Sequence, residues 1–233
     1  PFYKPSFPVI YVEAQYKKNI DALLKKTIPE VKEFKNIGLI ASVQHLYQLP
    51  KVQEVLEKAG KKVIIPLKRG HAFYDGQVLG CEYNALKVVS KNIDAFLILG
   101  NKFHALGAAL SVNKPIILLD PYNEEIAKIV DLKNKIIKHR FAAIEKAKQA
   151  KYFGIIVGVK EGQQFGSVEY AMEKLKKAGK KYVVITMNEI TNDKLVNLYN
   201  VDVFVELACP RIAIEDVAKF EKPLLTAREF AVV

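Results

Sequence analysis

Two cysteines, Cys81 and Cys209, are the residues of this chain whose type and setting favour redox or metal chemistry. Cys81 closes the segment GQVLGC (76–81) just before a predicted helix, and Cys209 is followed by Pro210, which suits the first position of a helix. Free N–H groups and the helix dipole stabilise the thiolate form of a cysteine placed there. Both residues are therefore candidate thiolates, the alternative being two small buried apolar side chains.

The sequence limits what these thiols can do. It contains no GxGxxG, GxxxxGK[ST], GxSxG, HExxH or CxxC motif, so a common dinucleotide site, a P-loop, an esterase elbow and a zinc knuckle are unsupported. A disulfide is not expected in a cytosolic chain. Two isolated cysteines do not complete an all-thiolate zinc or iron–sulfur site, and a third ligand from outside this sequence would do so.

An internal repeat defines the elements around the cysteines. At about 110 residues per unit it indicates homologous domains and not a solenoid, whose periods run at roughly 20 to 50 residues. The parallels are IGLIASVQ (37–44) with FGIIVGVK (153–160), AGKK (59–62) with AGKK (178–181), DAFLILG (94–100) with DVFVELA (202–208), and KPIILLD (114–120) with KPLLTAR (222–228).

The repeat also sets the expected domain boundaries. FPVIYVE (7–13) matches KPIILLD (114–120), so residues 1–13 are predicted to be the last strand of a preceding domain that lies outside this sequence. A second domain is expected over 14–122 and a third over 123–233.

Short, continuous, β-rich apolar runs alternate with helical stretches, which predicts an α/β fold with right-handed crossovers between parallel strands. Each domain is expected to be a roughly four-stranded parallel sheet flanked by helices. Long helical segments are predicted over 14–35 and 123–150. The predicted strands are 37–43, 63–65, 95–99, 116–119, 153–159, 182–186, 203–206 and 224–226, and the shorter helices are 51–59, 82–90, 167–178 and 192–199.

Composition narrows the class of partner. Thirty-six Lys and Arg against 25 Asp and Glu give a net charge of +11, which favours an acidic partner. The lysines are spread over helix faces and no aromatic-rich basic stretch is present, so no nucleic-acid partner is expected. No apolar run is long enough to span a membrane, and PFYKPSFP lacks the features of a signal peptide. A cytoplasmic protein without a membrane partner is expected.

Other polar groups are expected at the carboxyl ends of the strands, where ligands of parallel sheets collect. Gly76 and Gly80 would let the backbone approach a bulky ligand or take positive φ. Each side chain alone is more often a loop cap, but together they predict a polar rim around the thiols. The rim residues are Gln44 and His45 after one strand, Lys160, Gly162 and Gln163 after its counterpart, and His104 in GNKFHALG.

Several stretches resemble the archaeal family of the first step of diphthamide biosynthesis, non-classical radical S-adenosylmethionine enzymes. They run in the family's order over nearly the whole chain, and GQVLGC with ELACPR is the specific pair. The stretches are PVIYVEA (8–14), SVQHLYQLPKVQEVLEKAGKKV (42–63), GQVLGC (76–81), DAFLILGNKFHALGAAL (94–110), KPIILLDP (114–121) and ELACPR (206–211).

The resemblance implies three related α/β domains that each donate one cysteine to a 4Fe-4S cluster. Cys81 and Cys209 match the second and third cluster cysteines, and the first has no counterpart in this sequence. The implied reaction transfers a 3-amino-3-carboxypropyl group from S-adenosylmethionine to a histidine of elongation factor 2, through a 3-amino-3-carboxypropyl radical. The resemblance also implies a homodimer. Without a third cysteine, the chain is expected to hold a cluster poorly and to be inactive alone.

Positions near the thiols suggest contacts to the cofactor. Gln44, Gln77 and Gln163 are expected as polar contacts, and Arg211 as a partner for its carboxylate. No side chain is assigned a catalytic role. One alternative is a two-lobed module that binds a small molecule without chemistry, in which case the cysteines would be dispensable for binding. A second is a basic protein that binds RNA, for which binding would weaken steeply with salt.

Overall fold

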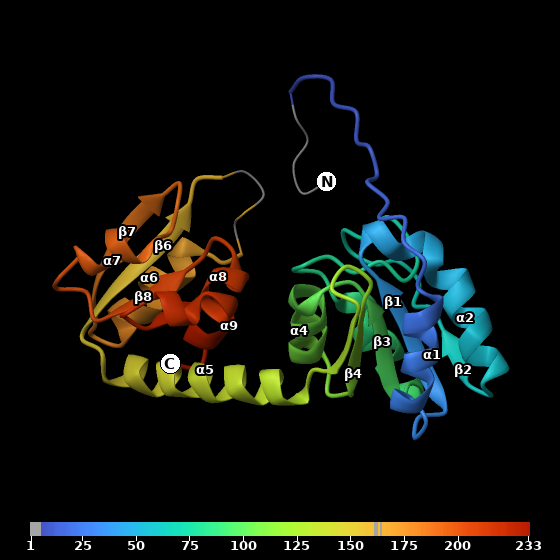
Figure 1. The fold of residues 1–233 in the computed structure, drawn as a ribbon. Helices are drawn as coiled ribbons and strands as arrows, with labels where there is room; N and C mark the ends of the chain where they lie inside the picture. Colours follow the sequence, from blue (N-terminus) through green and yellow to red (C-terminus); the bar gives the residue numbers. More distant parts are fainter. Residues whose placement is uncertain (1–5, 161–162, 164) are drawn as a thin grey trace. The chain divides into compact units, whose positions relative to one another are not determined.

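The computed structural model describes residues 6–160, 163 and 165–233, and the chain forms two compact units (Figure 1). The N-terminal unit ends at Asn134 and the C-terminal unit begins at Lys135, within helix α5 (Val130–Gln149). This division falls later than the 122/123 boundary expected from the sequence, because one more strand follows that point and pairs with the first sheet.

The N-terminal unit holds a five-stranded sheet in the order β2-β1-β3-β4-β5. The first four strands are parallel, and β5 is antiparallel to β4. The strands are β1 (Asn36–Ala41), β2 (Lys62–Ile64), β3 (Ala95–Leu99), β4 (Ile116–Asp120) and β5 (Glu125–Lys128), and the helices are α1 (Asp21–Glu30), α2 (Leu49–Lys58), α3 (Asn84–Val89) and α4 (Lys102–Ser111), with short 3-10 turns at Val43–Gln48 and Ser90–Asn92.

The C-terminal unit repeats this plan with a four-stranded, all-parallel sheet in the order β7-β6-β8-β9. The predicted α/β fold of parallel strands flanked by helices is therefore confirmed. The strands are β6 (Tyr152–Gly158), β7 (Lys181–Met187), β8 (Val203–Glu206) and β9 (Leu224–Thr226), and the helices after α5 are α6 (Val168–Lys177), α7 (Asn192–Val196), α8 (Pro210–Glu215) and α9 (Ala227–Phe230), with a 3-10 turn at Val217–Lys219.

Strand register shows that the sequence repeat is a structural repeat. Ile37 of β1 lies opposite Ala95 of β3, and their counterparts Phe153 and Val203 lie opposite each other in the second sheet. The pairing of the next strand along follows the same register in both sheets. The aligned segments therefore occupy equivalent places in two copies of one sheet.

A glycine lies opposite a phenylalanine on the central strands of each sheet. A Cβ on Gly38 of β1 would lie 2.4 Å from the ring of Phe96 on β3, and a Cβ on Gly154 would lie 2.5 Å from the ring of Phe204. Both rings are fully buried. Only glycine leaves room for the ring across the strand pair, which explains why both copies keep this combination.

Two long helical predictions were wrong in part. Helix α1 covers only Asp21–Glu30 of the expected 14–35, and residues 8–20 form neither helix nor strand. The expected helix over 123–150 begins instead with β5. The carboxylate of Asp120 accepts the N–H groups of Tyr122 and Asn123 at 2.9 and 3.0 Å, and Glu124 takes a positive φ of 55°. This turn sends the chain back along β4 before α5 starts.

The segment before α1 exposes apolar side chains. Ile10 is 91% exposed and Val12 is 84% exposed. Residues 6–13 pair with no strand in the described part of the chain, and residues 1–5 lie outside it. The assignment of 1–13 as the last strand of a preceding domain therefore stays a prediction.

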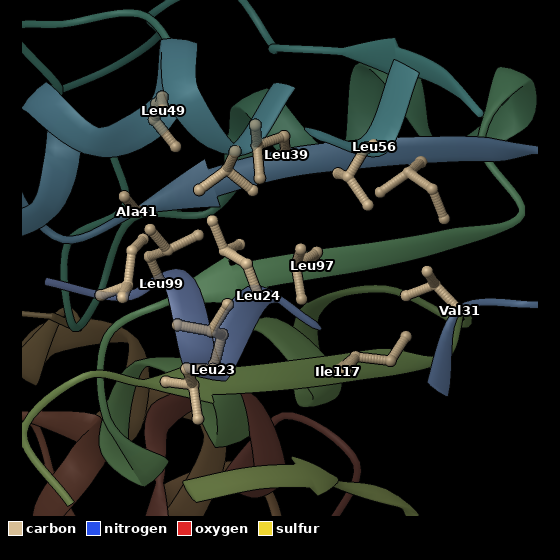
Figure 2. Close-up of a cluster of buried hydrophobic side chains, with 14 of the residues drawn as sticks. Leu23, Leu24, Val31, Leu39, Ala41, Leu49, Leu56, Leu97, Leu99 and Ile117 are labelled. Atoms are coloured by element: carbon tan, nitrogen blue, oxygen red, sulfur yellow. The ribbon is translucent and has the colours of Figure 1, made fainter. Parts of the chain in front are cut away.

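Leucine side chains from α1 and α2 fill one face of the first sheet. Leu24 of α1 and Leu56 of α2 are 2% and 1% exposed, and they belong to one cluster with the fully buried Leu39 and Leu97 of the strands (Figure 2). Burying one such side chain contributes about 2 kcal/mol to folding. The two helices are therefore held to the sheet by apolar packing.

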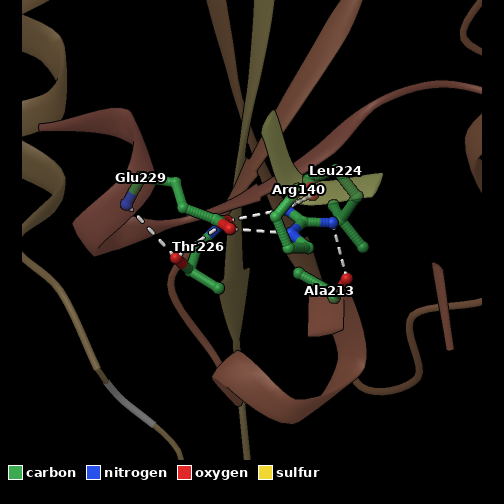
Figure 3. A network of polar contacts seen from close by, with 5 residues as sticks. All are labelled: Arg140, Ala213, Leu224, Thr226 and Glu229. Atoms are coloured by element: carbon green, nitrogen blue, oxygen red, sulfur yellow. Dashed lines mark hydrogen bonds and ion pairs between the residues drawn. The ribbon is translucent and has the colours of Figure 1, made fainter. Parts of the chain in front are cut away.

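A buried arginine joins α5 to the far elements of the C-terminal unit (Figure 3). Arg140 donates to both carboxylate oxygens of Glu229 at 2.7 and 2.6 Å, to the carbonyl of Ala213 at 2.7 Å and to that of Leu224 at 2.6 Å. Glu229 also forms a capping box with Thr226 at the start of α9. One guanidinium thus donates hydrogen bonds to a carbonyl of α8, a carbonyl of β9 and a carboxylate of α9.

Replacing Arg140 by Met would leave Glu229 and two carbonyls without their donor. We expect the free energy of unfolding to fall by about 3 kcal/mol in urea denaturation, because breaking a buried pair strands its partner. Arg228→Met, on the exposed side of α9, is the matched control and should change it little. Equal losses in both variants would contradict the role of the network.

An aspartate fixes the start of the central strand in each unit. The carboxylate of Asp94 accepts the N–H groups of Lys35 and Asn36 at 3.0 and 2.7 Å, and Asp202 binds the start of β6 in the same way with both distances 2.9 Å. These hydrogen bonds, above all those from the backbone, hold the pKa of both carboxyl groups below its ordinary value.

We expect Asp202→Ala to lower the free energy of unfolding by about 1 kcal/mol at neutral pH. Because the folded pKa is lowered, this contribution is complete above the ordinary carboxyl pKa of about 4 and disappears as the pH falls through the folded value. Urea denaturation at pH 7 and pH 3 measures the difference from the wild type. Glu173→Ala, on the exposed face of α6, serves as control. If the wild type and Asp202→Ala differ in free energy of unfolding by as much at pH 3 as at pH 7, the carboxylate of Asp202 does not stabilise the fold in this way.

Candidate functional site

The loops that carry the polar residues leave the carboxyl ends of the central strands. In the first sheet, β2 follows β1 in the chain and lies on one side of it, whereas β3 lies on the other side. The strand order therefore reverses at the crevice between β1 and β3. In the second sheet the same holds between β6 and β8. Ligands of open parallel sheets bind at such a crevice, and both cysteines belong to loops near these strand ends.

Cys209 directly precedes α8, as the sequence predicted. It is the N-cap residue, with φ −127°, and Pro210 is the first residue of the helix. Its side chain is half-buried and makes no capping hydrogen bond. The thiol is therefore not used to start the helix.

Glu206, at the end of β8, holds the backbone of the Cys209 loop. Its Oε2 accepts the N–H groups of Ala208 at 3.0 Å and of Cys209 at 2.9 Å, and the residue is only 1% exposed. Burial raises the pKa of this carboxyl to about 7, against the lowering effect of the two backbone donors. Sequence analysis gave Glu206 no role, although a charged residue inside a buried apolar strand was the available signal.

A small hollow of about 290 Å³ lies at the same edge of the second sheet. Gln163 and Lys160, two of the expected rim residues, contribute to its wall, whereas Gly162 lies outside the described residues. Its lining is Gly158, Lys160, Gln163, Met187, Asn188, Glu189, Ile190, Thr191, Ala208 and Ile212. The hollow therefore borders the loop that carries Cys209.

Cys81 lies in a tight turn and its side chain is exposed. The turn closes with a hydrogen bond from the N–H of Glu82 to the carbonyl of Leu79, at 3.3 Å. Helix α3 begins only at Asn84, whose N–H donates to Glu82 Oε1 at 2.8 Å. Cys81 thus precedes the helix without belonging to its first turn, and the predicted start at residue 82 was slightly early.

The two glycines of GQVLGC serve the loop in different ways. Gly76 has a positive φ of 72°, as expected, and a Cβ there would lie 2.8 Å from Ile65 and 2.9 Å from Leu49. A Cβ on Gly80 would clash with the ring of Phe103. Both glycines thereby fix the path of the chain into Cys81.

Two of the expected cofactor contacts have structural partners. Gln77 is 6% exposed, and its Oε1 accepts the N–H groups of Phe73 and Tyr74 at 2.7 and 3.1 Å. Arg211 is buried on α8 and forms an ion pair with Glu215. These contacts shape the loop and the helix, and the proposed cofactor contacts of both residues stay predictions.

Gln44 and Gln163 are exposed, each beyond the carboxyl end of the first strand of its sheet. Gln44 lies in the 3-10 turn after β1, and its carbonyl accepts the N–H of Tyr16 at 3.2 Å. Their places agree with the expected rim of each sheet. Their contacts to a cofactor likewise stay predictions.

The two rim histidines differ in environment. His45 is 6% exposed, and burial lowers its pKa, partly offset by the charge of Asp120. The ring of Tyr16 packs against it edge-on at 5.9 Å. His104 lies in the first turn of α4, with Nδ1 2.9 Å from Oδ1 of Asn101. His45 is thus held as a neutral ring, while His104 takes part in the start of its helix.

The two thiols are groups of this chain that could bind a metal ion or a cluster. Among the described residues, no three His, Cys, Asp or Glu side chains are grouped to hold a metal ion. The thiol of Cys209 makes no capping hydrogen bond, and Cys81 is exposed in a turn, so neither side chain is part of the apolar core. A thiolate is the usual ligand of iron in iron–sulfur clusters, so each thiol taken by itself has the chemistry of such a ligand.

These features define a class: a protein of repeated α/β units whose single cysteines lie on turns beyond the strand ends. A family model described as putative diphthamide synthesis protein matches residues 2–233. The chain belongs to this family.

Two curated relatives illustrate the match. The 2-(3-amino-3-carboxypropyl)histidine synthase of Pyrococcus horikoshii is 34% identical over 229 residues, which cover 97% of this chain and 65% of the relative. Subunit 1 of the synthase of Eremothecium gossypii is 28% identical over 228 residues, which cover 96% of this chain and 53% of the relative. The chain therefore spans between half and two thirds of the length of these relatives.

Solved structures give the same result. The crystal structure of Dph2 from Pyrococcus horikoshii with a 4Fe-4S cluster matches with a TM-score of 0.79 at 32% identity, over 91% of this chain and 61% of that chain. A second crystal structure of the same protein matches with a TM-score of 0.82. In the described part of this chain, no helix has the length and apolar character needed to cross a bilayer.

Gly76 and Gly60 form a matched pair for testing the Cys81 loop. Both have positive φ, at 72° and 77°, but a Cβ on Gly60 meets nothing within 4 Å. We expect Gly60→Ala to cost about 1 kcal/mol through backbone strain alone, and Gly76→Ala about 2 to 3 kcal/mol because it also clashes. Urea denaturation measures both. Equal costs would show that the close packing around Gly76 is not important.

Proposed function

We propose that this chain is part of an enzyme that transfers a 3-amino-3-carboxypropyl group from S-adenosylmethionine to a histidine of elongation factor 2. The observation that carries the proposal is the pair of thiols on strand-end turns, in a chain related to a protein crystallised with a 4Fe-4S cluster. When bound, such a cluster supplies the electron that cleaves a carbon–sulfur bond of S-adenosylmethionine.

Within this proposal Cys81 and Cys209 each donate one thiolate to the cluster, and a third comes from residues outside this chain. The exposure of Cys81 and the partial exposure of Cys209 leave both sulfur atoms accessible to iron. Three thiolates leave one iron open to the substrate. The loops must therefore hold the sulfur atoms at fixed places, which the turn at Cys81 and the carboxylate of Glu206 are suited to do.

The protein's part in the reaction is placement. Gln44 and Gln163, exposed at the strand ends, are available for hydrogen bonds to the polar groups of S-adenosylmethionine. The net charge of +11 suits docking to an acidic protein surface, and we propose that the elongation factor presents one. A homodimer and a cytoplasmic location belong to the same proposal by family resemblance.

The test uses the full-length protein reconstituted anaerobically with iron and sulfide. S-adenosylmethionine labelled in its aminocarboxypropyl carbons, dithionite and elongation factor 2 are added, and label on the factor is counted. We expect transfer by the wild type and loss of at least about a hundredfold in Cys81→Ala and Cys209→Ala, because each removes a cluster ligand. A reaction without dithionite controls for transfer that needs no electron.

A wild type that forms the cluster yet leaves the factor unlabelled would refute the proposed reaction. Ligand binding that survives both cysteine substitutions would instead favour the two-lobed binding module. Calorimetric titration with S-adenosylmethionine of the wild type and of both variants separates these outcomes.

A further inference from the structure

The repeat places Asn101 and Cys209 at equivalent positions. Asn101 directly follows DAFLILG (94–100), and Cys209 directly follows the matching DVFVELA (202–208). Each is the N-cap residue of the helix that follows, and each has a φ of −127°. The same backbone position therefore carries an amide side chain in one unit and a thiol in the other.

The two units fix this position with different side chains. In the N-terminal unit, Oδ1 of Asn101 accepts the N–H of His104 at 3.3 Å, which is the ordinary capping bond of a helix start. In the C-terminal unit, the side chain of Cys209 makes no capping bond. Sulfur is a weak acceptor, so a cysteine is a poor substitute for asparagine here.

Glu206 holds the turn before this helix start through other N–H groups than the one that a cap would bind. Its Oε2 accepts the N–H groups of Ala208 and Cys209. The counterpart of the His104 N–H is that of Ile212, which donates to the carbonyl of Cys209.

The counterpart of Glu206 in the other unit is Ile98, a fully buried apolar residue, and the N–H of Gly100, the counterpart of Ala208, donates instead to a carbonyl of β4. Glutamate at this position and cysteine at the next helix start thus occur together in one unit, and neither occurs in the other.

The carboxylate is unfavourable for the fold by itself. Glu206 is 1% exposed, and its Oε1 is buried without a hydrogen-bond partner. Burying such a group costs more than burying the isoleucine that the repeat places there, and apolar replacements at buried charged positions are often neutral or stabilising. A glutamate kept at this cost needs a compensating task, and its only hydrogen bonds in the described structure go to the Cys209 turn.

We propose that Glu206 is a positioning residue for Cys209: it fixes the backbone of the turn that carries the thiol, at a helix start where the thiol itself makes no capping bond. That the thiol binds a cluster rests on the function proposed above. The hold of Glu206 on the turn does not.

Thermal unfolding of this chain tests the hold of Glu206 on the turn. Glu206→Ile restores the residue of the other unit and removes both acceptors. We expect it to lower the Tm by about 3 °C or more, because the N–H groups of Ala208 and Cys209 lose their partner. In the Cys209→Asn background we expect a similar loss, since an asparagine cap would bind the N–H of Ile212 and not these two.

A Tm that Glu206→Ile leaves unchanged or raises would overturn the proposal, and so would a loss of Tm that Cys209→Asn abolishes. Glu206→Gln keeps an acceptor oxygen in nearly the same shape, so we expect it to retain the wild-type Tm within about 1 °C. A loss in Glu206→Gln as large as in Glu206→Ile would also contradict it, because the backbone contacts would not then be what matters.

Thiol reactivity gives a readout that general stability does not move. In a Cys81→Ser background, alkylation of Cys209 by iodoacetamide is followed by mass spectrometry, well below the Tm of every variant. We expect Glu206→Ile to raise the alkylation rate about tenfold, because a looser turn exposes the thiol more often, and Glu206→Gln to leave the rate unchanged. An unchanged rate in Glu206→Ile would refute the positioning role. Neither measurement requires a cluster, so both remain decisive if no label reaches the elongation factor.

Discussion

The parallel hydrogen-bond ladder between the central strands fixes the geometry of both sheets. It sets how closely β1 approaches β3 and β6 approaches β8, and a glycine in each pair leaves room for the phenylalanine ring opposite it. With the strands level, their carboxyl ends open at the same edge. The turns that carry chemistry leave from that edge, so their placement depends on the register of these strand pairs.

Much of the fold was predictable from the sequence because its apolar runs are short, continuous and repeated. The bounds of β3, β8 and β9 agree with the prediction residue by residue. The failures were local. The turn built by Asp120 and the strand β5 after it were missed, because an amphipathic stretch fits a helix until a side chain closes a turn in front of it.

The sequence predicts candidate residues for the site but not the groups that hold their turns. The thiols stand out by type, and Cys209 lies at a helix start as expected. The carboxylate that holds its turn lies inside a strand pattern that otherwise signals only burial. Gln77 shows the reverse case: it was selected as a ligand contact, and its oxygen is occupied by the backbone of its own loop. Which polar group faces a ligand is decided by loop geometry, which local sequence does not encode.

The exposed segment before α1 has a practical meaning for handling the protein. It presents Ile10 and Val12 to solvent in an extended, β-branched stretch without a partner strand among the described residues. An unpaired stretch of this kind is a template for pairing with another chain. The same feature that suits it to complete a neighbouring sheet makes the isolated chain prone to self-association, so solubility at high concentration depends on covering it.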